Sequence, residues 1–143
     1  MSDLLELTRE ECEAILRRGR IGRLAVAEGN VPYVVPVSFV FADDAIYGHT
    51  SPGHKLTLLR GARACAILVD EIQDFAVWSS VLARGRWNEL TDDEGTFRAR
   101  SLILARFGDP WWATAGHGHR TTLADAVFYR VDIESLTGRS QNA

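Results

Sequence analysis

Residues 31–41 read VPYVVPVSFVF, a run of valine, proline and aromatic residues with little polarity. Valine and aromatic side chains favour β-strands, and turn residues at 28–30 separate this run from another apolar run at 21–27, so the two are predicted to form a hairpin. Because both faces of the second strand are largely apolar, we expect both to be covered. Pro36 has no N–H for a sheet hydrogen bond, which predicts a bulge or an edge where a ligand can approach the backbone.

The rest of the chain alternates short strands with turns and contains no repeated βαβ unit. Further strands are predicted at residues 45–49, 64–69, 75–90 and 127–134. The last of these alternates apolar and polar side chains, and the long strand is expected to bend at Gly85. Six strands with short connections predict an antiparallel barrel rather than a doubly wound sheet. At 143 residues, the chain is expected to form a single domain over residues 1–143.

Three helices are predicted at the joints between strands, at residues 8–18, 52–61 and 91–106. The first begins with a capping box formed by Thr8 and Glu11, and it is expected to end at a left-handed Gly19. The second begins with a proline and ends with a glycine. Thr91 and Glu94 repeat the capping box at the start of the third helix, which stops at a Gly-Asp-Pro sequence.

Charge and composition exclude several classes of function. The chain has 16 basic and 19 acidic residues and no long run of like charges, so we expect no nucleic-acid or membrane partner. Cys12 and Cys65 lie in apolar surroundings without a metal-ligand spacing, which predicts buried free thiols and no metal site. The acidic N-terminus lacks the basic region of a signal peptide, and no apolar run is long enough to span a bilayer, so a soluble, cytoplasmic protein is expected.

Residues 49–55, HTSPGHK, place hydroxyl groups and a lysine at the start of the second predicted helix. The free N–H groups and positive dipole end of a helix attract a phosphate, the hydroxyls of Thr50 and Ser51 add hydrogen bonds, and Lys55 adds a counter-charge. Lysine is otherwise poorly placed in a first turn, where it faces a partial charge of its own sign. The pattern fits either an anion site or an ordinary Ser-Pro helix start with a solvated lysine. The sequence contains no glycine-rich P-loop or GxGxxG motif.

Several segments, taken in order, resemble one family of flavoproteins. They are RIGRLAVAEGNVPYVVPVSFVFADDAIYGHTSPGHKLTLLR, a strand ending in VDE, WSSVLARGRWNEL and VFYRVDIESLTGR. Together they resemble the pyridoxamine 5'-phosphate oxidase-like proteins over residues 7–139, nearest the nitroimidazole-resistance (Nim) branch. The resemblance implies a six-stranded antiparallel split β-barrel of α+β class that binds flavin mononucleotide (FMN). It also implies a homodimer whose two FMN sites lie between the subunits.

The resemblance assigns residues to three parts of the cofactor. Those implied along the flavin ring are Pro36, Val37 and Ser38. Those implied at the phosphate are Thr50, Ser51 and Lys55. Those implied to close the ring's pocket, from the partner subunit, are Trp78, Ser79 and Ser80.

The activity implied by the resemblance is that of an FMN-dependent oxidoreductase, a reductase of small aromatic or nitro-aromatic acceptors. His49 stands where the Nim-like branch tends to carry a histidine near the flavin. An imidazole with an ordinary pKa of about 6.5 can deliver a proton as electrons leave the flavin. The alternative for His49 is a histidine at a strand end that bonds to backbone groups. The chain shows no counterpart of the arginine-rich phosphate grip of the vitamin oxidases, so pyridoxamine oxidation is not expected.

Other interpretations stay open because a fold does not fix a function. One is a flavin- or haem-binding carrier or sensor without turnover, in which His49, His54, His117 or His119 ligates haem. Another is a deazaflavin-dependent reductase, which the net charge of −3 disfavours. His117 and His119 are not expected to bind a metal, because their glycine-flanked segment offers no second shell. With Trp111 and Trp112 this segment is expected to cover the flavin mouth, or else the tryptophans pack in the core or a dimer interface.

Overall fold

The computed structural model describes residues 3–108 and 126–142, which form eight strands and three helices. In chain order the elements are β1 (Asp3–Glu6), α1 (Arg9–Arg18), β2 (Ile21–Glu28), β3 (Val31–Ser38), β4 (Val40–Ala42), β5 (Ala45–Thr50), α2 (His54–Ala62), β6 (Ala64–Asp74), β7 (Val77–Glu89), α3 (Asp93–Phe107) and β8 (Val127–Asn142). None of the helices in the described ranges is both long and apolar enough to cross a membrane.

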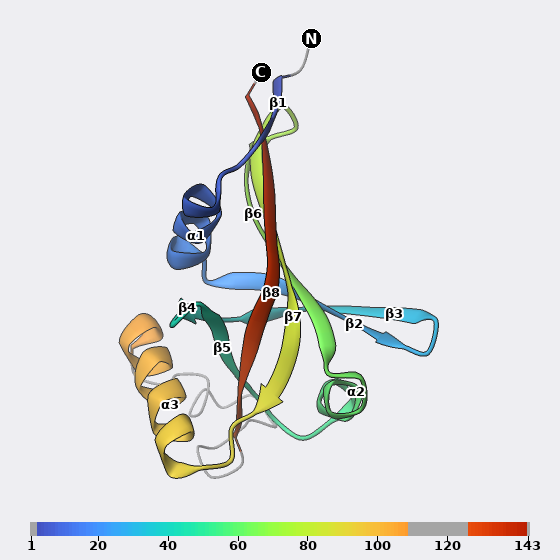
Figure 1. The fold of residues 1–143 in the computed structure, drawn as a ribbon, viewed down its shortest axis with the longest axis vertical. Helices are drawn as coiled ribbons and strands as arrows, with labels where there is room; N and C mark the ends of the chain where they lie inside the picture. Colours follow the sequence, from blue (N-terminus) through green and yellow to red (C-terminus); the bar gives the residue numbers. More distant parts are fainter. Residues whose placement is uncertain (1–2, 109–125, 143) are drawn as a thin grey trace.

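Every strand pair is antiparallel, and the strands lie in the order β3-β2-β6-β7-β8-β5-β4, with β1 added to β8. The sheet curls around a core without closing, which confirms the predicted split barrel (Figure 1). Strands β6, β7 and β8 continue past the barrel. We call this projection the arm: it consists of β1, the β6–β7 hairpin from residue 70 to residue 80, and residues 139–142 of β8. The arm forms the upper part of Figure 1, with α1 beside it.

The structure has two strands more than the six predicted. Strand β1 was missed because its residues carry no clear alternation, and it forms by pairing with the end of β8. The predicted strand at 31–41 divides into β3 and β4 at Phe39. The Phe39 ring is fully buried, and its N–H donates to the carbonyl oxygen of Arg20 at 3.0 Å instead of to a neighbouring strand. The buried Phe39 side chain therefore anchors the end of β3 in the core.

Two clusters of buried side chains hold the elements together. The larger cluster lies inside the barrel and beneath α1, and its largest members are Trp87, Tyr129, Phe39 and Leu16. The smaller cluster fixes α3 against β4, β5 and β8. Each large side chain buried in this way contributes roughly 1.5–3 kcal/mol to folding. Cys12 and Cys65 are buried in the larger cluster as free thiols, as predicted.

Several local predictions are confirmed in detail. The Thr8 hydroxyl accepts a hydrogen bond from the Glu11 N–H at 3.1 Å, and the Glu11 carboxylate accepts one from the Thr8 N–H at 2.8 Å, which completes the capping box. The register of β7 against β8 shifts at Gly85, where the bend was expected. A side chain at this position would overlap the carbonyl oxygen of Asp132, so the close approach of the two strands requires glycine.

Predictions of helix ends are less accurate. Gly19 follows α1 in an extended conformation with φ −71°, so the predicted left-handed cap is wrong. Helix α3 is capped by Asp92 and not by Thr91, because the Asp92 carboxylate accepts the Gly95 N–H at 2.6 Å. A carboxylate is also the better partner for the positive end of a helix than a hydroxyl is.

Helix α2 also differs from its prediction at both ends. It begins at His54 after an N-cap at Gly53, and Pro52 lies in the preceding bend. Gly61 lies inside the helix, and the chain turns at Arg63, which adopts a left-handed φ of 63°. The Arg63 side chain reaches the Asn88 amide oxygen at 2.5 Å and the Trp87 carbonyl oxygen at 3.3 Å, contacts that favour this conformation.

The prediction that both faces of β3 are covered is wrong within a single chain. Val31 and Val34 are 63% and 59% exposed. Among the described residues β3 pairs only with β2, so it is an edge strand, as Pro36 predicted. One sheet face thus points away from the core, and no element in residues 3–108 and 126–142 covers it. We call it the outer face. Its large apolar side chains are Ile21, Val34, Leu68, Leu82 and Ile72, and the register places Arg23, Asp70 and Arg84 on the same face.

Candidate functional site

One small cavity brings together residues from three elements. It has a volume of about 240 Å³ and lies where the end of β3, the end of β5 and the start of α2 meet. Its lining residues are Pro36, Val37, Ser38, His49, Thr50, Ser51 and Lys55. The sequence predicted a role for every one of these residues, and the structure places them around one space.

The β3 side of the cavity is an open backbone edge. Pro36 lies opposite Arg23 of β2, and no described strand pairs with the other edge of β3. Val37 is buried in the barrel core and fixes the strand in place, whereas Ser38 is only partly buried. The peptide groups along this edge of β3 therefore have no described strand as a partner and are available to a ligand.

The β5 side depends on close packing against β8. Gly48 lies opposite Tyr129, and a side chain at Gly48 would overlap the Tyr129 hydroxyl. The next pair in the register is His49 with Phe128, whose rings lie 6.5 Å apart between centroids. Thr50 is buried, and its hydroxyl donates to the Ser51 carbonyl oxygen at 3.3 Å. Packing on β8 thus sets the position at which His49 enters the cavity.

The α2 side carries an uncapped helix start and a lysine. No side chain caps α2, because its N-cap residue is Gly53. Lys55 lies in the first turn, and in the described part of the chain it forms no ion pair with a carboxylate. Burial lowers the pKa of Lys55 from its usual value. A partly desolvated cation at the positive end of a helix dipole is unfavourable by itself, and an anion in the cavity would relieve both costs.

Lys55 is also the only lysine of the sequence, since the other 15 of the 16 basic residues are arginines. Lysine presents a compact charge with three donors, which suits a phosphate held by backbone N–H groups. This compositional signal was available from the sequence alone and supports the anion-site interpretation over a solvated lysine.

His49 has a strongly altered acidity. Burial, and then the nearby charge of Lys55, lower the pKa of His49 to about 4. The imidazole is therefore neutral at pH 7, whereas the sequence argument for proton delivery assumed an ordinary value of about 6.5. A lone sequence position gives no information on burial, so this difference could not be predicted.

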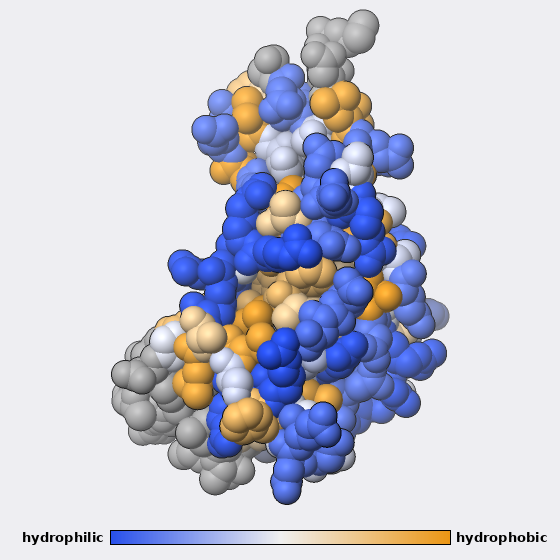
Figure 2. Space-filling model, turned by 60° about the vertical axis from the view of Figure 1, so that its left-hand side comes forward, coloured by the Kyte–Doolittle hydropathy of each residue, from blue (hydrophilic) through white to orange (hydrophobic). Residues whose placement is uncertain are grey.

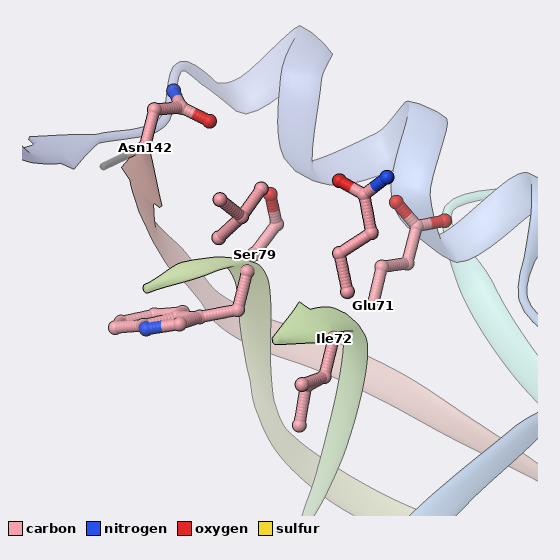
Figure 3. Close-up of a pocket in the computed structure, with 7 residues that line it drawn as sticks. Glu71, Ile72, Ser79 and Asn142 are labelled. Atoms are coloured by element: carbon pink, nitrogen blue, oxygen red, sulfur yellow. The ribbon is translucent and has the colours of Figure 1, made fainter. Parts of the chain in front are cut away.

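The residues predicted from the long strand do not line this cavity. Trp78 and Ser79 line a separate hollow of about 490 Å³ in the arm, together with Glu71, Ile72 and Asn142 among others (Figure 3). Figure 3 shows Glu71 pointing toward the α1 ribbon and Ile72 pointing the opposite way. Neither Trp78 nor Ser79 lines the cavity around His49, and Ser80 lies in the same part of the arm.

One contact beside the cavity was not predicted. The Tyr33 ring on β3 meets the His54 ring of α2 edge to face, with centroids 5.4 Å apart and planes at 84°. His54 Nε2 also lies 3.4 Å from a carboxylate oxygen of Glu28 at the end of β2. The sequence indicated only that His54 was exposed, because nothing in it showed that the hairpin folds against α2.

The predicted loop residues His117, His119, Trp111 and Trp112 lie outside the described residues. Within residues 3–108 and 126–142, no group of three or more His, Cys, Asp or Glu side chains is arranged to hold a metal ion.

The geometry defines an antiparallel split barrel with a polar cavity at the start of α2. The family model described as pyridoxamine 5'-phosphate oxidase matches residues 8–140, and the chain belongs to this family. A crystal structure of an FAD-binding protein from Mesorhizobium loti is 31% identical, covers 100% of both chains and has a TM-score of 0.81. An uncharacterised protein from Rhizobium meliloti is 27% identical over 94% of this chain and 93% of its own length.

A third match concerns the fold alone. The structure of a putative 5-nitroimidazole antibiotic resistance protein from Bacteroides thetaiotaomicron has a TM-score of 0.76 at 17% identity, covering 99% of this chain and 89% of that chain. The Nim-like architecture implied by the sequence is therefore shared, while the activity of that protein does not follow from this degree of identity.

Proposed function

We propose that this protein is a flavin-dependent oxidoreductase that binds the FMN moiety in the cavity between β3, β5 and α2 and reduces small aromatic or nitro-aromatic acceptors. The observation that carries the proposal is that one space is bordered by the β3 edge, by His49 and by the half-buried Lys55, which has no carboxylate partner among the described residues. The FAD-binding Mesorhizobium protein supports it, because FAD contains the whole of FMN.

The residues present fit a phosphorylated flavin. The phosphate lies at the start of α2, where free backbone N–H groups, the Ser51 hydroxyl and Lys55 bind it. The backbone of residues 36–38 binds the polar edge of the ring. A bound flavin supplies the electron transfer, and the chain's part is to hold the ring, place the acceptor and exclude water.

His49 has a conditional role in this proposal. A neutral imidazole has one donor and one acceptor nitrogen, and one of these would face the cofactor or the acceptor. Burial, the main cause of the low His49 pKa, persists when a cofactor binds, but a phosphate beside Lys55 would offset the second cause, the Lys55 charge, and move this pKa part of the way upward. Proton delivery by His49 is thus expected only with the cofactor in place.

A second copy of the chain completes the site in this proposal. The cavity of about 240 Å³ is smaller than typical ligand pockets of about 300–1,000 Å³, so a flavin ring needs a further wall. The uncovered outer face provides an apolar surface for a homodimer, and Trp78 shares this face with Leu82. The partner's arm would then bring Trp78 to the ring.

The test is to purify the protein under air, record its visible spectrum and titrate FMN against the flavin-free protein. We expect a flavin spectrum and quenching of FMN fluorescence at micromolar or lower concentrations. A colourless protein that ignores added FMN contradicts the proposal. A Soret band on addition of haem, with no flavin binding, would replace it with the haem-carrier alternative.

A further inference from the structure

Beside the cavity lies a small exposed platform made of Tyr33, His54 and Glu28, which we call the hairpin shelf. The His54 and Glu28 side chains are 57% and 56% exposed. The Tyr33 ring is partly buried against the barrel core, so it is held firmly while its partner ring faces solvent. The shelf therefore offers a fixed aromatic pair with a carboxylate at its side.

The shelf is close to the proposed phosphate position. His54 is the residue between the N-cap Gly53 and Lys55, and consecutive Cα atoms are about 3.8 Å apart. Tyr33 precedes Pro36 by three residues on β3, which is roughly 10 Å along a strand. In Figure 1 the β2–β3 hairpin projects on the same side of the barrel as α2. A group attached to the bound phosphate can reach the shelf without crossing the protein.

The chemistry of the shelf suits a purine nucleotide. Purine bases stack on aromatic side chains, and histidine and tyrosine both serve as stacking partners. A carboxylate such as Glu28 accepts hydrogen bonds from an exocyclic amine or a ribose hydroxyl. A second phosphate would lie near His54 and the positive end of α2.

We propose that the hairpin shelf binds the adenylate half of FAD, so that this protein prefers FAD to FMN. The inference rests on the proposed function, because the FMN half must first occupy the cavity. FAD differs from FMN only by this adenylate, so the comparison of the two cofactors isolates the shelf. If the shelf only held the hairpin against α2, changing its residues would alter the affinities for FMN and FAD equally.

The experiment measures the dissociation constants of FMN and FAD by fluorescence quenching with the flavin-free full-length protein. We expect FAD to bind at least about ten times more tightly than FMN. A factor of this size lies within the range that stacking of one base contributes to affinity. Tyr33→Leu and His54→Leu should each remove most of this preference and leave FMN binding unchanged, whereas His54→Phe should retain it. Phe97→Leu, which alters an exposed aromatic residue on α3, is the matched control.

The outcomes separate the two proposals. Equal affinities for FMN and FAD in the parent protein overturn the adenylate site but keep the flavin cavity. Equal weakening of both cofactors by Tyr33→Leu also overturns it, since the shelf would then act only on the shape of the cavity. Binding of neither cofactor overturns the proposed function and the inference together.

Discussion

The cavity and the arm differ in how completely a single chain builds them. The cavity is polar, and its lining residues come from elements that pack on one another within the barrel. The arm carries exposed apolar side chains among polar ones: Ile72 is 67% and Phe75 93% exposed, and both lie in its hairpin. Figure 2 shows hydrophobic side chains at the upper, arm end of the molecule and again in its lower half, separated by hydrophilic ones.

This difference shows which part of the proposed cofactor site a single chain forms. The phosphate end is assembled by local packing of β5 on β8 and of α2 on the hairpin. Among the described residues only positions 36–38, 49–51 and 55 line the cavity, so a wall for the proposed flavin ring has to come from elsewhere, and apolar side chains are exposed on the arm and the outer face. Changes at the cavity should therefore affect cofactor binding directly, and changes on the arm should act through a second copy.

The largest effect is expected at the phosphate end. A Lys55→Ala and Ser51→Ala double variant removes one charge-assisted and one neutral hydrogen bond, worth about 1.5–3 and 0.5–1.5 kcal/mol. We therefore expect FMN affinity to fall by about thirtyfold to a thousandfold in fluorescence titrations. Arg60→Ala, in the same helix but paired with Glu89 at the surface, is the control and should bind FMN normally. A double variant that binds FMN like its parent would show that the cavity does not hold the phosphate.

The sequence predicted the cavity and the strands around it well, for identifiable reasons. Alternation and valine content located β2, β3, β5 and β8, and the helix-start pattern identified Thr50, Ser51 and Lys55 before they were seen to share a cavity. The Pro36 edge was predicted because proline lacks an N–H. These features are local, and local patterns suffice to identify them.

The remaining features depend on contacts distant in sequence. Phe39 leaves the β-ladder because its N–H meets Arg20, and Asp92 replaces Thr91 as a cap because its carboxylate reaches Gly95. The acidity of His49 depends on burial beneath several elements. The homodimer that would cover the outer face stays a prediction.

The second prediction concerns His49 and pH. Because its pKa is lowered to about 4 in the folded chain, protons bind more readily after unfolding, and the stability from the neutral side chain is lost as pH falls from about 6.5 toward 4. The loss at this residue is at most about 3 kcal/mol. Urea unfolding across this range should show a smaller decline for His49→Asn than for the parent, with His54→Asn as control. Parallel declines for parent and His49→Asn would contradict the buried, neutral state.

The third prediction tests whether the arm completes a partner's cavity. Trp78→Ala should weaken FMN binding about tenfold by removing an aromatic wall. Mixing this variant with Lys55→Ala and allowing subunits to exchange should restore tight binding at about a quarter of the sites, because half of the dimers are mixed and each has one intact site. Titrating FMN into the mixture and into each variant alone measures this fraction. No gain on mixing would mean that Trp78 does not act across the interface.

The smallest effect is expected at the tip of the arm. Ile72→Ser and Phe75→Ser leave the chain's own core intact, because both side chains are exposed in it. Partial cover by a second copy would give each side chain only a fraction of the roughly 1.5–3 kcal/mol of full burial, so each change should weaken dimerisation slightly while leaving the unfolding of the monomer unchanged. Sedimentation over a range of concentrations measures this, with Phe97→Ser on α3 as a matched exposed control. If the arm and control variants associate equally well, the arm contributes nothing to the dimer, and the missing wall of the cavity must come from the outer face of the barrel.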